Sequence, residues 1–299
     1  MNITGQTWVI AMSILGAVFI FDFFNARRRP REVKPLEAAL WTIFYIALAL
    51  GFAIFLAQQV GAQASNEFLA GWLTEYSLSI DNLFIFIIIF GALKLPKERE
   101  QAALMAGIAL ALFFRAIFIG IGAFVIHKFV AVFFLFGAFL LYTAFHLGKG
   151  GGGDEDWHEG RVLGYFKKKG LSPFGLSIIA LGITDVLFAV DSIPAIFGLT
   201  REAFIVFTAN AFALLGLRQL YFLLGALASR LVYLSKGLAV ILAFIGLKLI
   251  LEAAHGVHWT QIGSVELPEI GTNFSLIFIV SVLAVTTVAS VVKTRRSGD

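Results

Sequence analysis

Nine runs of mostly apolar residues divide this 299-residue chain. Each run is long enough to cross the hydrocarbon core of a bilayer as one helix. The runs cover about 7–24, 38–58, 69–93, 102–125, 129–147, 173–196, 203–224, 234–252 and 274–292. Hydrophobic residues make up 59% of the chain and charged residues 14%, against about 45–50% and about 25% in soluble domains. We therefore predict an all-α, polytopic transmembrane helical bundle with about nine spans, forming a single domain over residues 1–299.

The positive charges are concentrated on alternate loops between these runs. With the N-terminus outside, the segments predicted to lie inside hold eighteen of the 23 Lys and Arg residues. The outside loops hold only Lys128 and Arg201. Cytoplasmic loops of membrane proteins carry an excess of Lys and Arg. The pattern predicts an external N-terminus and a cytoplasmic C-terminus, and it explains the net charge of +4 without nucleic acid as a partner.

A ten-residue motif occurs twice. TEYSLSIDNL at 74–83 and TDVLFAVDSI at 184–193 share Thr, an acid, four residues, Ile or Val, Asp, and a polar–apolar pair. An arginine in an apolar run follows each copy, Arg115 after the first and Arg218 after the second. The copies begin three spans apart, so they run in opposite directions. We predict an inverted 3+3 helix repeat, with residues 69–147 and 173–252 as its halves and a cytoplasmic Gly/acidic loop at 148–172.

Each copy of the motif places hard oxygen ligands on one side of its helix, because positions seven apart lie nearly above one another. The candidate metal ligands are Glu75, Asp81, Asn82, Asp185, Asp191 and Ser192, with Thr74, Thr184 and Asn210 as possible additional ligands. The chain has no cysteine and no histidine at a span centre. Mg²⁺, Ca²⁺ and Mn²⁺ fit this set better than copper or zinc, and the ligand types do not separate these three. Acidic and His residues at 154–159 and 253–273 are interpreted as solvated linkers.

Carboxylates deep in a membrane need compensation, since insertion of each costs about 2.5–3.5 kcal/mol at the helix centre. Arg115 and Arg218, as gating or charge-tuning residues, can balance two of the four acids. Ion pairing alone would make the acids structural. Lys248 and Glu75 lie near span ends, so both can reach the water interface. The two remaining negative charges match one divalent cation, or two protons when the cation is absent.

Three segments of the sequence resemble a known family. They are TEYSLSIDNLFIF, FLLYTAFHLGKGGG and ALGITDVLFAVDSIPAIFGLTREAFIVFTANAFALLGLRQLYFLL. They look like the TerC/Alx family of integral membrane proteins, most clearly over about 36–255. The resemblance implies Mn²⁺ efflux across the bacterial inner membrane, linked to alkaline pH in the Alx branch. It assigns the family's intramembrane acids to Glu75, Asp81, Asp185 and Asp191, with Asn82 and Ser192 as companions.

We therefore expect a secondary transporter that exports Mn²⁺ as its substrate, with proton exchange as the expected coupling. An enzyme is not expected, because the spans hold no Ser/His/Asp or Cys/His arrangement and the chain has no phosphate-binding loop. A Ca²⁺ or Mg²⁺ transporter of the same architecture stays open. So does a membrane scaffold or assembly factor with structural acidic residues, since plant relatives are linked to membrane-protein biogenesis. Membrane lipid is an expected partner, and the oligomeric state is left open.

Overall fold

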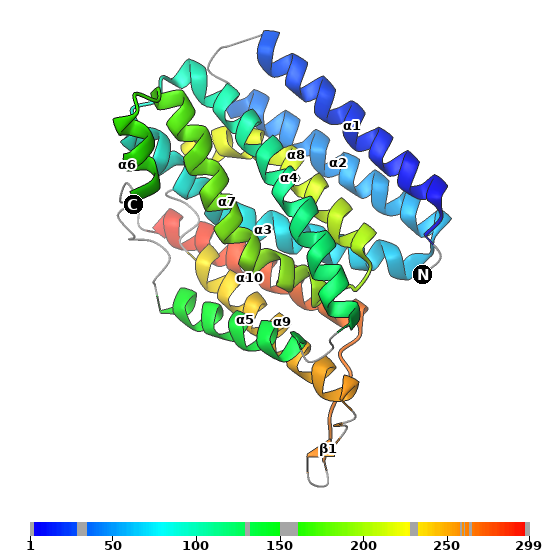
Figure 1. Ribbon diagram of the computed structural model, residues 1–299. Coiled ribbons are helices and arrows are strands. Elements are labelled where there is room, and N and C mark those ends of the chain that lie inside the picture. The colour runs from blue at the N-terminus through cyan, green and yellow to red at the C-terminus, as the bar shows by residue number, and fades with distance from the viewer. Residues whose placement is uncertain are drawn as a thin grey trace.

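The computed structural model describes residues 3–28, 35–128, 132–149, 161–227, 233–257, 259, 261–262 and 265–296. The long helices of this part of the chain lie side by side in one bundle, with α1 and α2 at one edge and α5 and α9 at the opposite edge (Figure 1). The helices are α1 (Gly5–Arg28), α2 (Pro35–Gln59), α3 (Ala62–Ala92), α4 (Lys97–Lys128), α5 (Val132–Gly148), α6 (Arg161–Lys168), α7 (Pro173–Phe197), α8 (Ala203–Leu227), α9 (Leu234–Gly256) and α10 (Thr272–Arg296). A small antiparallel hairpin of β1 (Gln261–Ile262) and β2 (Val265–Glu266) follows α9.

Each of the nine predicted apolar runs overlaps one helix in the described part of the chain. Seven of the described helices are long and apolar enough to cross a membrane, namely α1, α2, α4, α7, α8, α9 and α10. Helix α5 is apolar but shorter, and the 31-residue α3 interrupts its apolar residues with acids. The prediction of an all-α multi-pass membrane protein is thus confirmed. Helix α6 adds an eight-residue helix to the segment predicted as a loop, whose residues 150–160 lie outside the described residues.

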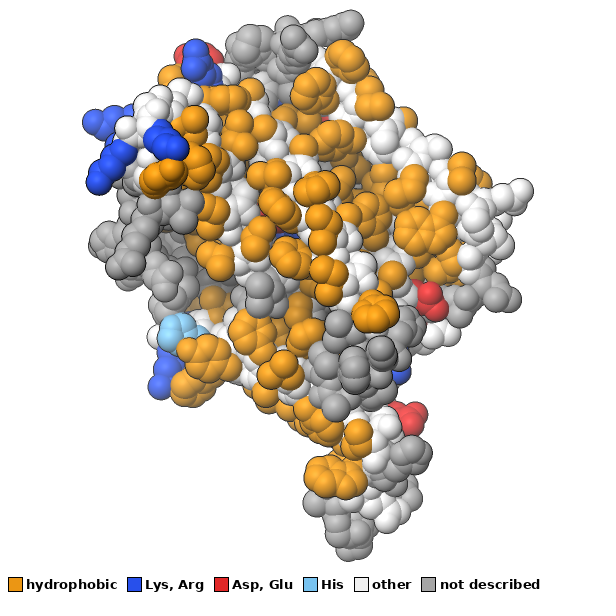
Figure 2. Space-filling view, viewed as in Figure 1, with side chains coloured by type: hydrophobic (Ala, Val, Ile, Leu, Met, Phe, Trp, Pro, Cys, Tyr) orange, Lys and Arg blue, Asp and Glu red, His pale blue; other side chains and the backbone are white. Residues whose placement is uncertain are grey.

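Apolar side chains cover much of the face of the bundle that Figure 2 shows. Large hydrophobic residues such as Val9, Leu135 and Val285 are each about two-thirds exposed, at 66%, 68% and 68%. Lys and Arg side chains gather at the edge of this face, around α6 (Figure 2). An exposed apolar area this extensive would aggregate in water and is suited to contact with lipid chains.

Helix α8 lies near the centre of the bundle, and almost all of its apolar stretch is buried. It packs on α2, α3 and α4, while α4 also packs on α7, and α5 packs on α9. Three apolar clusters fill the spaces between these helices. Phe52, Phe68 and Phe212 join α2, α3 and α8. These contacts fix α3, α4, α7 and α8 around the polar groups at the middle of the bundle.

Helices α5 and α9 approach closely at Gly137 and Gly246. A Cβ atom on Gly137 would lie 2.6 Å from Ile250 Cγ1 and 2.7 Å from the Gly246 carbonyl oxygen. We expect Gly137→Ala to lower the free energy of unfolding by about 1–3 kcal/mol through overpacking. Gly120→Ala is the matched control, because nothing lies within 4 Å of its Cβ position. Thermal unfolding in detergent should show a lower midpoint for Gly137→Ala alone, and equal midpoints would contradict the close helix contact.

Candidate cation site

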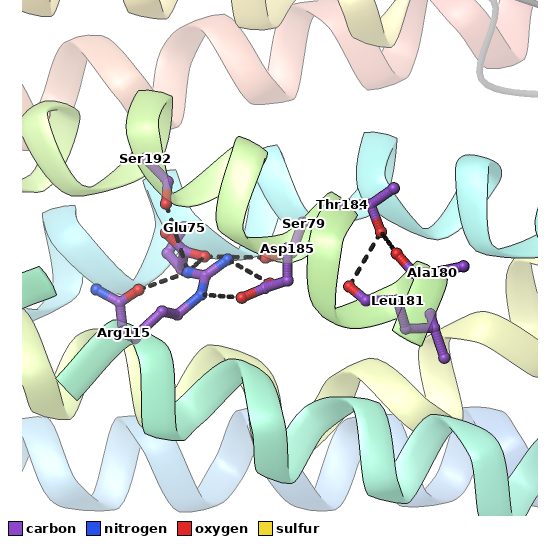
Figure 3. A network of polar contacts seen from close by, with 9 residues as sticks. Glu75, Ser79, Arg115, Ala180, Leu181, Thr184, Asp185 and Ser192 are labelled. Atoms are coloured by element: carbon purple, nitrogen blue, oxygen red, sulfur yellow. Dashed lines mark hydrogen bonds and ion pairs between the residues drawn. The ribbon is translucent and has the colours of Figure 1, made fainter. Parts of the chain in front are cut away.

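Arg115 of α4 lies at the centre of a buried polar network (Figure 3). Its Nη1 donates hydrogen bonds to Glu75 Oε1 and, at 2.6 Å, to Asn210 Oδ1. Its Nε and Nη2 donate to the two carboxylate oxygens of Asp185, at 3.3 Å and 3.0 Å. Ser192 Oγ lies 3.4 Å from Nη1. Arg115, Glu75 and Asn210 are fully buried, and Asp185 is 4% exposed.

The network joins four helices and both copies of the sequence motif. Glu75 comes from α3 and Asp185 from α7, so the first acid of each copy contacts the same guanidinium. These two residues lie 110 positions apart in the chain. The two acids come close because α3 packs against α7. Helix α3 also packs against α8, and α7 also packs against α4. Pro194 lies within α7, where its missing N–H leaves the carbonyl group four residues earlier without its usual helical donor.

The charges within this described network do not balance. Glu75 and Asp185 are two acids, and they share one guanidinium. Glu75 Oε1 also accepts a hydrogen bond from Ser79 Oγ at 3.2 Å, whereas Glu75 Oε2 is buried with no hydrogen-bond partner among the described side chains. Within the same described part of the chain, Thr74 Oγ1 is also buried and without a partner. An unpaired buried polar atom costs about 1–3 kcal/mol, so both oxygens could contact a cation, and the Glu75 carboxylate could instead take a proton.

The other predicted ligands are less closely associated with Arg115. Thr184 donates its hydroxyl hydrogen to the carbonyl oxygens of Ala180 and Leu181 on its own helix, and it points away from the network (Figure 3). Asn82 is buried in α3, but no hydrogen bond joins it to the network. The predictions for Asp81 and Asp191 concern side chains outside the described residues. Within the part of the chain that the structure describes, no three His, Asp or Glu side chains form a group that could hold a metal ion.

Two expectations about exposure are wrong. Glu75 was expected to reach water from near the start of its span, yet its exposed fraction is 0%. The reason is that α3 begins at Ala62, so Glu75 lies almost four turns into a helix that is covered by α2, α7, α8 and α10. Lys248 was expected to extend to the interface, yet it is only 7% exposed. Its side chain instead lines a polar cavity near the end of α9.

Arg218 pairs with a different acid from the two that Arg115 contacts. Its Nη2 donates to the carboxylate Oδ1 of Asp22 on α1, and both side chains are buried. Tyr45 of α2 lies beside this pair, although its hydroxyl makes no hydrogen bond of regular geometry. Sequence reasoning missed Asp22, which stands alone among phenylalanines in FIFDFFN. A single acid inside an apolar run was the available signal, because such residues are rare unless paired or functional.

The Asp22–Arg218 pair yields a stability prediction. Asp22→Asn is expected to lower the free energy of unfolding by about 3–5 kcal/mol, since it removes one partner of a buried ion pair. Arg218→Gln should cost a similar amount, and the double variant should cost less than the sum of the two. Denaturant unfolding of the four proteins measures this coupling. Strict additivity would contradict a direct contact between the two side chains.

The fold and this network define the chain as a polytopic helical membrane protein with ionisable groups buried at its centre. The model of the "Integral membrane protein TerC family" matches residues 60–298. The chain belongs to this family. Asp22, on α1, lies outside the matched residues, whereas its partner Arg218 lies within them.

Relatives in other bacteria match nearly the whole chain. An uncharacterized membrane protein of Mycobacterium tuberculosis is 37% identical, with 97% of this chain and 80% of the relative covered. An uncharacterized membrane protein of Myxococcus xanthus is 31% identical, with coverage of 97% and 93%. Alx of Escherichia coli, named as a candidate membrane-bound redox modulator, is 35% identical, with coverage of 82% and 84%. No solved structure matches the chain.

Proposed function

We propose that the protein is a secondary transporter that exports Mn²⁺ across the bacterial inner membrane, using the network around Glu75 and Asp185 as its cation site. One observation carries this proposal. The first acids of the two motif copies meet on a single guanidinium, with one negative charge in excess and one carboxylate oxygen unpartnered. Buried ionisable residues inside membrane helices commonly mark an ion pathway.

The pattern of helix contacts supports an inverted repeat. Exchanging α3 with α7, α4 with α8 and α5 with α9 turns the α3–α8 contact into the α7–α4 contact. The same exchange leaves the α3–α7, α4–α8 and α5–α9 contacts in place. In this proposal α3 and α5 also cross the membrane, which gives nine spans with the N-terminus outside. Transporters with inverted repeats bind their substrates near the midplane, between the two halves.

The balance of intramembrane charge favours a divalent cation with an accompanying proton. Counting Asp22, five acids in the spans belong to the two motif copies or to the buried ion pairs, namely Asp22, Glu75, Asp81, Asp185 and Asp191. Two arginines, Arg115 and Arg218, oppose them, so three negative charges remain. A divalent ion and one proton would neutralise that excess in a low-dielectric interior. In this mechanism Arg115 is the resting counter-ion, and the arriving cation takes over part of its contact with Glu75 and Asp185.

The choice of Mn²⁺ over Ca²⁺ and Mg²⁺ follows the family resemblance, since oxygen ligands suit all three. The redox role in the name of the Alx relatives is compatible with it. This chain has no cysteine, so a redox role would act through the transported metal and not through a thiol of its own. The Arg115 ion pairs also favour a second candidate, a scaffold in which the acids only hold helices together.

Transport by inside-out vesicles separates these candidates. Vesicles that contain the protein should accumulate Mn²⁺ faster than empty ones, and excess Ca²⁺ or Mg²⁺ should compete weakly. Asp81→Asn and Asp191→Asn should abolish uptake at normal protein levels. Strong competition would change the substrate to the competing ion. A loss of protein level without a specific transport defect would favour the scaffold.

A further inference from the structure

A polar cavity of about 560 Å³ lies near the starts of α3 and α10 and the ends of α7 and α9. All of these helix ends belong to the side predicted to face outside. Four carboxylates and three basic groups line it: Glu67, Glu202, Glu252, Glu269, Arg201, Lys248 and His255. With His255 neutral, the acids outnumber the positive charges by two. The interpretation of residues 253–273 as a plain linker therefore omits a part of the lining, since His255 and Glu269 both face this space.

Lys248 is the least expected group in this lining. It is 93% buried, since its exposed fraction is 7%, and it makes no hydrogen bond or close ion pair with a described residue. Glu252 and Glu67 are the carboxylates that act on it electrostatically. An ammonium group carries three donors, and burying it without acceptors is unfavourable. Its donors therefore need acceptors within the cavity, either water or the neighbouring carboxylates.

The carboxylates of the cavity are held apart by separate partners. Glu67 accepts hydrogen bonds from Thr200 Oγ1 and, at 2.9 Å, from Gln63 Nε2. Glu252 forms an ion pair with Arg201 at 2.8 Å, at a more exposed position. No three acidic or His side chains in the described parts of the chain come together as direct metal ligands. The cavity therefore suits an ion that keeps its water shell, as small divalent cations commonly do.

Helix α3 contributes one acid to the cavity and another to the central network, and the two sites are separate. Glu67 precedes Glu75 on α3 by eight residues, or about 12 Å along the helix axis. Between them, Gly71 packs closely against Ile196 and Ala209, with its Cβ position 3.2 Å and 3.3 Å from their side chains. Ile196 and Ala209 are fully buried. Apolar contacts thus lie between the central network and the cavity at this point of α3.

We propose that this cavity is a low-affinity release site for a hydrated divalent cation, in which the Lys248 ammonium competes for the carboxylates that attract the ion. The inference rests on the proposed export function and adds the step after the central site. Export requires weak binding on the outer side, since a tightly held ion would not leave. The Lys248 ammonium, which is fixed to the chain, lowers the affinity of the cavity for the divalent ion. It does so by interacting with the same carboxylates, namely Glu67, Glu202, Glu252 and Glu269. Arg201 and His255 face the same space and set its remaining charge.

Equilibrium dialysis of Mn²⁺ against the purified full-length protein in detergent tests the proposal. The wild type should show a tight class and a weak class of bound Mn²⁺. Lys248→Met should raise the affinity of the weak class about tenfold, because one competing charge is gone. Lys248→Arg keeps the charge and should leave it unchanged. Mg²⁺ should compete equally well with Mn²⁺ for the weak class, since a hydrated ion is recognised by charge and size.

Further variants separate this inference from the central site. Glu67→Gln combined with Glu252→Gln should remove the weak class and keep the tight one, whereas Glu75→Gln should do the reverse. Glu98 is an exposed acid at the start of α4, on the side predicted to face the cytoplasm. Glu98→Gln should change neither class of bound Mn²⁺. A wild type without a weak class overturns the inference, and so does a weak class whose affinity for Mn²⁺ is not changed by Lys248→Met. A weak class that responds as expected while the tight class is missing contradicts the central site alone.

Discussion

Glu75→Gln is expected to abolish tight Mn²⁺ binding while leaving the protein folded. The substitution removes the excess negative charge, so Asp185 and Arg115 remain as a balanced pair. The Gln side chain can still accept the hydrogen bonds that Arg115 and Ser79 donate to Glu75. We expect a loss of affinity of at least about 100-fold, or about 2.7 kcal/mol, because a charged oxygen ligand becomes neutral.

Mn²⁺ titration and thermal unfolding of the same preparation measure this effect. Glu98→Gln is the control, because it neutralises an acid that lies away from the network. It should bind Mn²⁺ with the affinity of the wild type. A Glu75→Gln protein that binds and exports Mn²⁺ normally would remove Glu75 from the site. A variant that is lost from the membrane would indicate that Glu75 is needed for folding, as the scaffold function requires.

Arg115→Gln is expected to destabilise the protein strongly. It leaves Glu75 and Asp185 side by side without their shared positive charge, which should lower the free energy of unfolding by about 3–5 kcal/mol. A cation that binds between these carboxylates replaces the missing charge. At one and the same Mn²⁺ concentration, the cation should therefore stabilise this variant more than the wild type. A protein gains about 2.7 kcal/mol when Mn²⁺ is present at 100 times its dissociation constant.

The midpoint of thermal unfolding, measured with and without Mn²⁺, tests this expectation. Arg115→Lys is the matched variant, because it keeps the charge but loses the fork that donates to both oxygens of Asp185. Its stability should lie between the other two proteins. If Mn²⁺ raised the midpoints of the wild type and Arg115→Gln equally, the cation would not be binding between Glu75 and Asp185.

The helices of this fold could be predicted because hydropathy in a membrane protein depends on local sequence. A run such as 203–224 must be a buried or lipid-facing helix, and α8 extends over that run. The convergence of Glu75 and Asp185 could also be anticipated, since the repeated motif implies two helices that meet in equivalent orientations. What the motif does not specify is which arginine meets them. Arg115 contacts both acids, whereas Arg218 pairs with Asp22 of α1.

The missed features depend on contacts between distant parts of the chain. Asp22 belongs to no motif, and only the packing of α1 against α8 reveals its partner. Lys248 lies near a helix end, where a lysine usually extends to water. The segment before α10 instead helps to form a cavity around it. Thr184 matches the motif, yet its hydroxyl bonds to its own helix, as Ser and Thr side chains in helices often do.

Locating Mn²⁺ by its anomalous scattering in crystals of the full-length protein is the most direct test of the cation site. We predict one strong peak within about 2.0–2.6 Å of the Glu75 and Asp185 carboxylate oxygens, the range for hard divalent cations. The Arg115 guanidinium should then have moved away from at least one of these acids. A peak found only at the surface or in the outer cavity, with Arg115 still bonded to both acids, would contradict a cation site at the centre of the bundle.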